Sequence, residues 1–364
     1  MPEELKKQNA MTRRGFLESA AFAGTAVVAG AALGGPVLMA QTPPRTSASS
    51  PAPAVRHTDL IDVHHHYAPA EYITEINPKS PLSPPIRTWN LEKTLADMEK
   101  TGTGIAILSI SNPGLWFGDR ESTRKLARTC NEYGARIVSN NRKRFGAFVA
   151  VPLPNPDDAL KEIEYGLDVL KFDGVGFMTN YAGKYLGDAA FAPVWAELNR
   201  RKALVYTHPI TCPSCENLVP GVAPRVIEFG TDTTRTIASL VFSGVTSKYP
   251  DIRWLFSHAG GTMPFLIDRF QEAAKEPANA KRLPNGLMYE LQRFYYDTAQ
   301  SAHPVTMTTL AKVIPLSQVV FGTDFPFRGG EEQVASLYKS GFSIQEIRGI
   351  ERDNAVRLMP RLKG

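Results

Sequence analysis

Three of the seven histidines in this 364-residue chain are consecutive, at His64, His65 and His66. On a β-strand, side chains alternate, so His64 and His66 would share one face while His65 points to the helical layer or to solvent. Two imidazoles on one face can hold a metal ion, and the alternative is that they are core histidines satisfied by backbone groups. Further ligands at the ends of other strands favour the metal.

Such residues follow three other predicted strands: His208 in Thr-His-Pro, His258 in Ser-His-Ala-Gly-Gly and Asp324 in Gly-Thr-Asp-Phe-Pro. The predicted metal ligands are His64, His66, His208 and Asp324. Imidazole nitrogens with one carboxylate suit zinc best, with manganese or iron as alternatives. We expect His258 to be a general base beside the metal, or else a fifth ligand.

The elements that must position these residues are short β-branched runs, each followed by a turn and a helix-like stretch. The eight predicted strands are residues 60–65, 104–110, 145–151, 174–178, 203–207, 252–257, 294–297 and 318–323. They predict a (β/α)8 barrel, whose active site lies at the carboxyl ends of the strands. An open doubly wound sheet is the runner-up, but its first strand usually precedes a glycine-rich phosphate loop, and here three histidines take that place.

The first 56 residues differ in composition from the rest. Arg13 and Arg14 precede an apolar run rich in Ala, Gly and Val, so residues 1–40 resemble a twin-arginine signal peptide. This predicts export to the periplasm through the bacterial twin-arginine machinery, with a retained membrane anchor as the alternative. Residues 41–56 read as a flexible linker and residues 57–364 as one barrel domain. The formal charge of +5 is spread along the chain and indicates no nucleic-acid surface.

Three cysteines are too few for a disulfide scaffold, and one Cys-x-x-Cys pair lacks the second pair of a structural zinc site. In an oxidising compartment Cys212 and Cys215 form a local disulfide, or they are two unpaired loop cysteines. The chain has no Gly-x-Ser-x-Gly elbow, no His-Glu-x-x-His helix and no Walker-type loop. A Ser-His-Asp triad stays open at this point.

With these residues assembled, the chain resembles the amidohydrolase superfamily, in the branch of metal-dependent nonoxidative decarboxylases that includes 2-amino-3-carboxymuconate-6-semialdehyde decarboxylase. Residues 61–67 (IDVHHHY), 179–188 (TNYAGKYLGD) and 232–235 (DTTR) are most similar to 6-methylsalicylate decarboxylase-like proteins. The resemblance covers roughly residues 60–359. It implies the four ligands named above, His258 as the catalytic histidine, and a homodimer.

Binuclear relatives carry a modified lysine on the fourth strand, and residues 174–180 contain none, so one metal is expected. The twin-arginine leader departs from the family pattern. The physiological substrate therefore does not follow from the resemblance.

The resemblance implies a carboxy-lyase for a small carboxylate such as 6-methylsalicylate, with Asp324 as proton donor to the ring carbon and His258 as base. Arg235 could bind the substrate carboxylate with two hydrogen bonds, or make a surface or interface salt bridge. Phe177 and Phe325 could close the mouth of the site, or belong to the core. The alternatives are a hydrolase of a lactone or amide that uses metal-activated water, and a non-catalytic exported carrier.

Overall fold

The computed structural model describes residues 59–363 except 142 and 217. The predicted signal peptide and linker lie outside these residues. Within the part described, no helix is long and apolar enough to cross a membrane.

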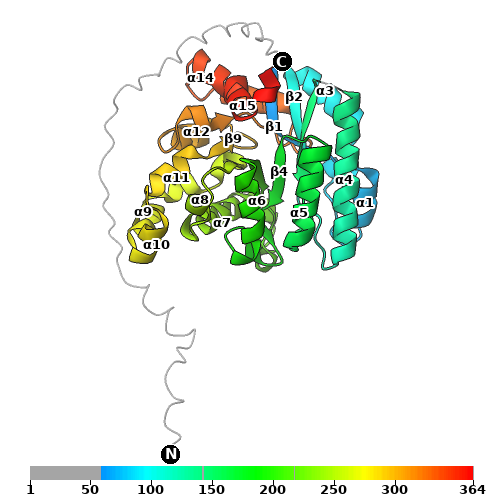
Figure 1. Ribbon diagram of the computed structural model, residues 1–364. Coiled ribbons are helices and arrows are strands. Elements are labelled where there is room, and N and C mark those ends of the chain that lie inside the picture. Colours follow the sequence, from blue (N-terminus) through cyan, green and yellow to red (C-terminus); the bar gives the residue numbers. More distant parts are fainter. Residues whose placement is uncertain (1–58, 142, 217, 364) are drawn as a thin grey trace, which may run out of the picture. The chain divides into compact units, whose positions relative to one another are not determined.

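Eight parallel strands form one sheet that curls into a barrel, in the order β1-β2-β3-β4-β7-β8-β9-β10 (Figure 1). The strands are β1 Leu60–His66, β2 Thr103–Ser109, β3 Phe145–Ala150, β4 Gly174–Met178, β7 Leu204–His208, β8 Arg253–Phe256, β9 Tyr295–Asp297 and β10 Val319–Val320. Backbone hydrogen bonds close the ring between the first strand and the segment after the last, from Val63 N to Phe321 O (3.0 Å) and from His66 N to Phe325 O (2.8 Å). The predicted (β/α)8 barrel is confirmed.

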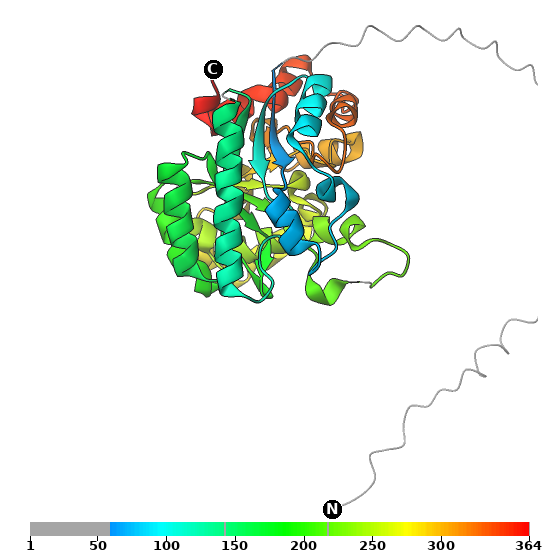
Figure 2. The ribbon, with the colours of Figure 1, turned by 90° about the vertical axis from the view of Figure 1, so that its right-hand side faces the viewer.

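Helices cover the outside of the barrel, as two views at right angles show (Figures 1 and 2). They are α1 Ala70–Ile76, α2 Pro84–Arg87, α3 Leu91–Thr101, α4 Arg120–Asn140, α5 Pro156–Glu164, α6 Ala192–Arg200, α7 Glu228–Phe242, α8 Val245–Lys248, α9 Ile267–Lys275, α10 Pro277–Arg282, α11 Leu287–Arg293, α12 Pro304–Ala311, α13 Gly330–Leu337, α14 Ile344–Arg348 and α15 Asn354–Leu358. Several begin at a capping side chain that accepts a backbone N–H of the first turn, as Asn90 does from Lys93 and Asp119 from Ser122. Local sequence thus fixes where these helices start.

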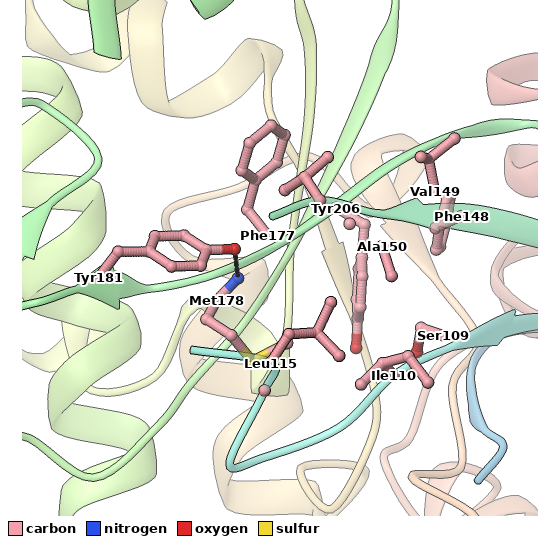
Figure 3. A pocket seen from close by; sticks show the side chains of 13 residues that line it. Ser109, Ile110, Leu115, Phe148, Val149, Ala150, Phe177, Met178, Tyr181 and Tyr206 are labelled. Carbon is pink, nitrogen blue, oxygen red and sulfur yellow. Dashed lines mark hydrogen bonds between the residues drawn. The ribbon is translucent and has the colours of Figure 1, made fainter. Parts of the chain in front are cut away.

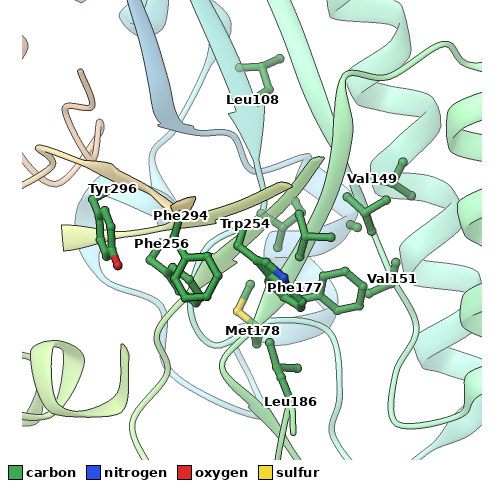
Figure 4. Packing of buried hydrophobic residues seen from close by; sticks show 14 of the residues in the cluster. Leu108, Val149, Val151, Phe177, Met178, Leu186, Trp254, Phe256, Phe294 and Tyr296 are labelled. Atoms are coloured by element: carbon green, nitrogen blue, oxygen red, sulfur yellow. The ribbon is translucent and has the colours of Figure 1, made fainter. Parts of the chain in front are cut away.

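Two apolar cores hold the layers together. The larger lies between strands and helices and contains Phe177, Trp195 and Trp254 (Figure 4). The smaller contains alternate strand residues such as Ile107, with Leu358 from α15 packed among them. This arrangement leaves the carboxyl ends of the strands to carry polar side chains.

Two local features differ from the predicted elements. A two-stranded hairpin, β5 Asn180–Tyr181 with β6 Lys184–Tyr185, follows β4 and was not predicted. The eighth strand is regular over only two residues, because beyond Val320 the chain bonds elsewhere. Phe321 N donates to Ile350 O (2.9 Å), and Gly322 N donates to the Thr298 hydroxyl (3.1 Å).

Candidate metal centre

The predicted chemical residues meet at one end of the barrel. His64 and His66 lie on β1, and His208 is the last residue of β7, while His258 and Asp324 follow β8 and β10. The three strand histidines are 0% exposed and Asp324 is 1% exposed, whereas His258 is 8% exposed. His258 is therefore the member of the cluster that lies nearest to solvent.

The side-chain atoms of all five residues converge. The Nε2 atoms of His64 and His66 are 3.0 Å apart, and Asp324 Oδ1 lies 3.2 Å and 2.9 Å from them. His208 Nε2 is 4.0 Å from the same oxygen, and His258 Nε2 is 3.3 Å from Oδ2. The structure thus brings the four predicted ligands and His258 together.

A second set of four ligands is also possible, and it shares three residues with the predicted set. The donor atoms of His64, His208, His258 and Asp324 all lie within 4.8 Å of one another. That set contains His258 in place of His66. His66 remains the better candidate ligand of the two, because its Nε2 lies 2.9 Å from an oxygen of Asp324, whereas the Nε2 of His258 lies 3.3 Å away.

The other ring nitrogen of each strand histidine faces an acceptor. Nδ1 lies 2.8 Å from Asp297 Oδ2 in His64, 3.3 Å from Ser109 O in His66 and 2.9 Å from Pro209 O in His208. A carboxylate or a carbonyl only accepts, so the Nδ1 atoms of His64 and His208 carry a hydrogen, and each of these rings can present its Nε2 to a metal once it holds no second proton. The Nδ1 of His66 also lies 3.0 Å from the Ser109 hydroxyl, which can donate or accept. A hydrogen on Nδ1 is what a ligand that binds through Nε2 requires.

The buried cluster needs positive charge at its centre. Burial opposes protonation of His64, but the carboxylates of Asp297 and Asp324 raise the pKa of His64 to about 10. Burial lowers the pKa of His66 and of His208. Burial would raise the pKa of Asp324, yet His64 and the other imidazoles hold it well below its usual range. Without a metal, this charge must come from a proton on His64.

A divalent cation fits this donor set. The buried Nε2 of His208 has no hydrogen-bond partner among the described residues, and the Nε2 atoms of His64 and His66, 3.0 Å apart, require either a shared proton or a cation near both. Imidazole nitrogens with one carboxylate bind ions such as zinc or manganese. The residues present therefore fit one divalent metal.

Two buried aspartates that were not predicted hold the ligands in place. Asp297, at the end of β9, binds the ring of His64 and accepts from His258 N (2.9 Å). Asp62 accepts from His64 N (3.0 Å) and from His65 Nδ1 (2.8 Å). His65 is therefore buried, with its Nδ1 bound to Asp62, and it is not exposed to solvent as one of the two predicted orientations had it. Asp297 could have been found in the sequence, because it is a carboxylate at the end of a predicted strand.

The backbone beside the cluster is strained. His258 and Asp324 have φ of 54° and 65°, in the left-handed region that costs a non-glycine residue about 1–3 kcal/mol. Gly322 lies so close to β1 that a Cβ atom there would be 2.8 Å from His64 Cβ. The surrounding hydrogen bonds must offset this strain, as is usual at functional sites.

The predicted substrate residues Arg235 and Phe177 are held by other contacts. Arg235 on α7 forms ion pairs with Glu228 (3.3 Å) and Asp232 (3.8 Å), and no described ion pair joins it to the histidines. Phe177 is fully buried, its ring packs against Trp195 of α6, and it also lines the small cavity described below. Burial of this aromatic between strand and helix is what its core role requires.

Aromatic rings contact the histidines from two other positions. Phe325 stacks on His65, with ring centroids 4.6 Å apart. Phe229 on α7, which was not predicted, faces His208 at 6.0 Å and His258 at 6.5 Å. A phenylalanine in the first turn of a helix gives no such signal in the sequence.

A small cavity lies beside the cluster, at the carboxyl ends of β2, β3 and β4 (Figure 3). Its lining is mostly apolar and includes Leu115, Ala150 and Met178. Ser109 joins it to the cluster, since its hydroxyl is 3.0 Å from His66 Nδ1. A free volume of about 20 Å³ accommodates one group of the size of water or a methyl.

The sequence matches the family model described as amidohydrolase over residues 61–361. The chain belongs to the amidohydrolase family. This amidohydrolase is 34% identical over 318 residues to the 6-methylsalicylic acid decarboxylase of Penicillium expansum, with 84% of this chain and 97% of the relative covered. The family predicted from the sequence is thereby confirmed.

Solved structures share the fold of this amidohydrolase. A structure described as amidohydrolase II is 27% identical, with a TM-score of 0.78, and covers 83% of this chain and all of its own. A dihydroxybenzoic acid decarboxylase from Polaromonas sp. JS666, with bound manganese and the inhibitor 2-nitroresorcinol, is 22% identical with a TM-score of 0.74. It covers 84% of this chain and 98% of its own.

The contact between Asp297 and His64 gives a test of the metal centre. Changing Asp297 to Asn removes the charge that orients the imidazole, so we expect metal affinity to fall about 10–100-fold. Metal content after dialysis against a series of metal buffers measures this. Asp173→Asn is the control, because Asp173 is also a buried carboxylate, with Arg361 as its partner. Equal metal affinity in both variants would contradict the assignment.

Proposed function

We propose that this protein is a metal-dependent nonoxidative decarboxylase of 2-hydroxybenzoate-like acids such as 6-methylsalicylate. The observation that carries the proposal is the buried cluster of imidazole nitrogens around Asp324, with His258 at its solvent side. The name of the Penicillium expansum relative supports this substrate class. The reaction converts an aryl carboxylate and one proton into the arene and CO2.

His64, His66, His208 and Asp324 hold one divalent metal in this proposal, zinc or manganese. The bound ion supplies a Lewis acid and an anchor for the carboxylate and the adjacent phenol oxygen of the substrate. The protein must then deliver a proton to the ring carbon that bears the carboxylate, since an aryl carbanion is too unstable to form first.

Asp324 and His258 supply the proton path in this proposal. The surrounding imidazoles keep Asp324 ionised at rest, so it must receive a proton before it can donate one. His258 Nε2 is 3.3 Å from Asp324 Oδ2, and its Nδ1 has no described hydrogen-bond partner. His258 can accept the phenol proton and pass it to Asp324, which presents it to the ring carbon. Gln300 also donates to Asp324 and holds the carboxylate in position.

The cavity beside His66 offers a place for a ring substituent. Its apolar lining and its size suit a methyl group, and 6-methylsalicylate carries one. Phe229, whose ring faces His208 and His258, and the predicted residue Arg235 are the candidates for contact with the rest of the substrate. Arg235 would first have to leave Glu228 and Asp232.

CO2 release from a panel of 2-hydroxybenzoates tests the proposed reaction. We expect Asp324→Asn to abolish release, and His258→Asn to lower kcat about 10²–10⁴-fold with the metal still bound. His303→Asn is a matched control, because His303 caps α12 away from the cluster and Asn also caps helices well. A ring-opened acid from a lactone, with no CO2 from the panel, would instead support the metal-dependent hydrolase.

Filling the cavity tests the place of the substituent. Ala150→Leu adds bulk where the methyl group would lie, so we expect kcat/KM for 6-methylsalicylate to fall about 10–200-fold relative to unsubstituted salicylate. Steady-state kinetics with both substrates measure the ratio. A variant that slows both substrates equally would place the methyl group elsewhere.

We further propose that residues 1–40 direct export through the twin-arginine pathway and that the enzyme is a homodimer. Replacing Arg13 and Arg14 by Lys should keep the full-length protein in the cytoplasm of a bacterial host, because this pathway reads the arginine pair. Cell fractionation measures the distribution. Periplasmic accumulation of the double variant would contradict the proposed route.

A further inference from the structure

Two cysteines lie on the segment that leaves the metal centre after β7, four and seven residues beyond His208. Cys215 N donates a hydrogen bond of 2.7 Å to Cys212 O, which closes a tight turn between them. The ends of such a turn lie less than about 7 Å apart between Cα atoms, within or near the range that a disulfide spans. The backbone therefore already holds them close enough to be linked.

The two thiols differ in the way that thiol–disulfide exchange requires. Cys212 is partly exposed, and its Sγ lies 3.1 Å from the hydroxyl of Ser214. Hydrogen bonds from Ser214 lower the pKa of the Cys212 thiol. Cys215 is buried, and burial raises the pKa of its thiol. An accessible thiol with a lowered pKa attacks first, and a shielded neighbour then resolves the mixed disulfide.

The cysteine pair lies beside a buried network that reaches the metal-binding strand. Asp232 of α7 accepts hydrogen bonds from the hydroxyls of Thr179 and Tyr185. The Thr179 hydroxyl accepts from Ile210 N (3.1 Å), and Thr179 N donates to His208 O (3.0 Å). The segment between His208 and the cysteines is therefore pinned to the network around Asp232.

Both thiols also interact electrostatically with this network. Cys212 lies within range of electrostatic interaction with Tyr185 and Asp232. Cys215 lies within range of such an interaction with Arg235. A covalent link between the sulfur atoms would change how both side chains face these groups.

We propose that Cys212 and Cys215 form a reversible dithiol–disulfide site that fixes the segment between β7 and the Asp232 network. This site does not depend on the proposed reaction at the metal. Its co-reactant is a small disulfide such as oxidised glutathione. The Cys212 thiolate attacks one sulfur of that disulfide, which forms a mixed disulfide and releases one thiol.

Cys215 then attacks the Cys212 sulfur, forms the internal bond and releases the second thiol. Two electrons pass from the cysteine pair to the small disulfide. The two cysteine protons end on the released thiols, so the exchange is balanced.

Mass analysis of the full-length protein across a series of reduced and oxidised glutathione mixtures tests the site. After reduction, re-oxidation, acid quenching and alkylation of the denatured chain, we expect Cys212 and Cys215 to be linked while Cys130 is alkylated. Cys215→Ser should stop at a mixed disulfide on Cys212, and Cys212→Ser should remain largely unmodified. Cys130→Ser, at a buried cysteine of α4, should behave like the unaltered protein. Failure of the pair to link in any mixture would overturn the proposal.

Amide hydrogen exchange tests the effect on the segment. In the metal-loaded protein, oxidation should slow exchange of residues 209–216 several-fold, and Cys215→Ser should abolish that difference. Equal exchange in the oxidised and reduced forms would overturn the structural role of the bond. Neither readout involves catalysis, so loss of the proposed decarboxylase activity would leave this result standing.

Discussion

The structure depends on positive charge being supplied to the buried metal centre, which is shielded from solvent. Three histidine rings turn their Nε2 atoms toward the carboxylate of Asp324, and all four groups are almost completely buried. Uncompensated polar atoms cost several kcal/mol in such surroundings, so the arrangement is stable only around a cation. A proton on His64 meets part of that need, and a divalent metal meets it while also using the free nitrogen of His208.

The barrel supplies this geometry through two further carboxylates. Asp62 ties β1 to the segment after β10, because it accepts both from His64 N and from the hydroxyl of Thr323 (2.6 Å). Asp297 fixes the ring of His64 and the backbone of His258. The contacts that close the barrel therefore also orient the metal ligands. The same hydrogen bonds offset the backbone strain at His258 and Asp324.

Much of this could be predicted from the sequence, because the ligands follow β-branched runs and a parallel barrel brings all strand ends to one face. The alternation of side chains on β1 was sufficient to pair His64 with His66. The second layer could not be predicted in the same way. Asp62 and Asp297 also bind partners more than 200 residues away, Thr323 and His64 respectively, and no local pattern indicates these contacts.

Substrate residues were harder still to predict. Arg235 lies in a motif similar to one of the family and Phe177 on the fourth predicted strand. The orientation of Phe177 depends on packing against Trp195, and that of Arg235 depends on the acidic neighbours Glu228 and Asp232. Residue type alone does not indicate which way a side chain faces. Phe229, which does face the cluster, lies in the first turn of α7.

The most direct test of the account is a metal titration of the stripped enzyme, followed by CO2 release from 6-methylsalicylate. The account predicts no release without metal, and a linear rise that ends at one equivalent of zinc or manganese per chain. Release from the stripped protein, or a saturated site that releases no CO2 from any 2-hydroxybenzoate, would contradict it.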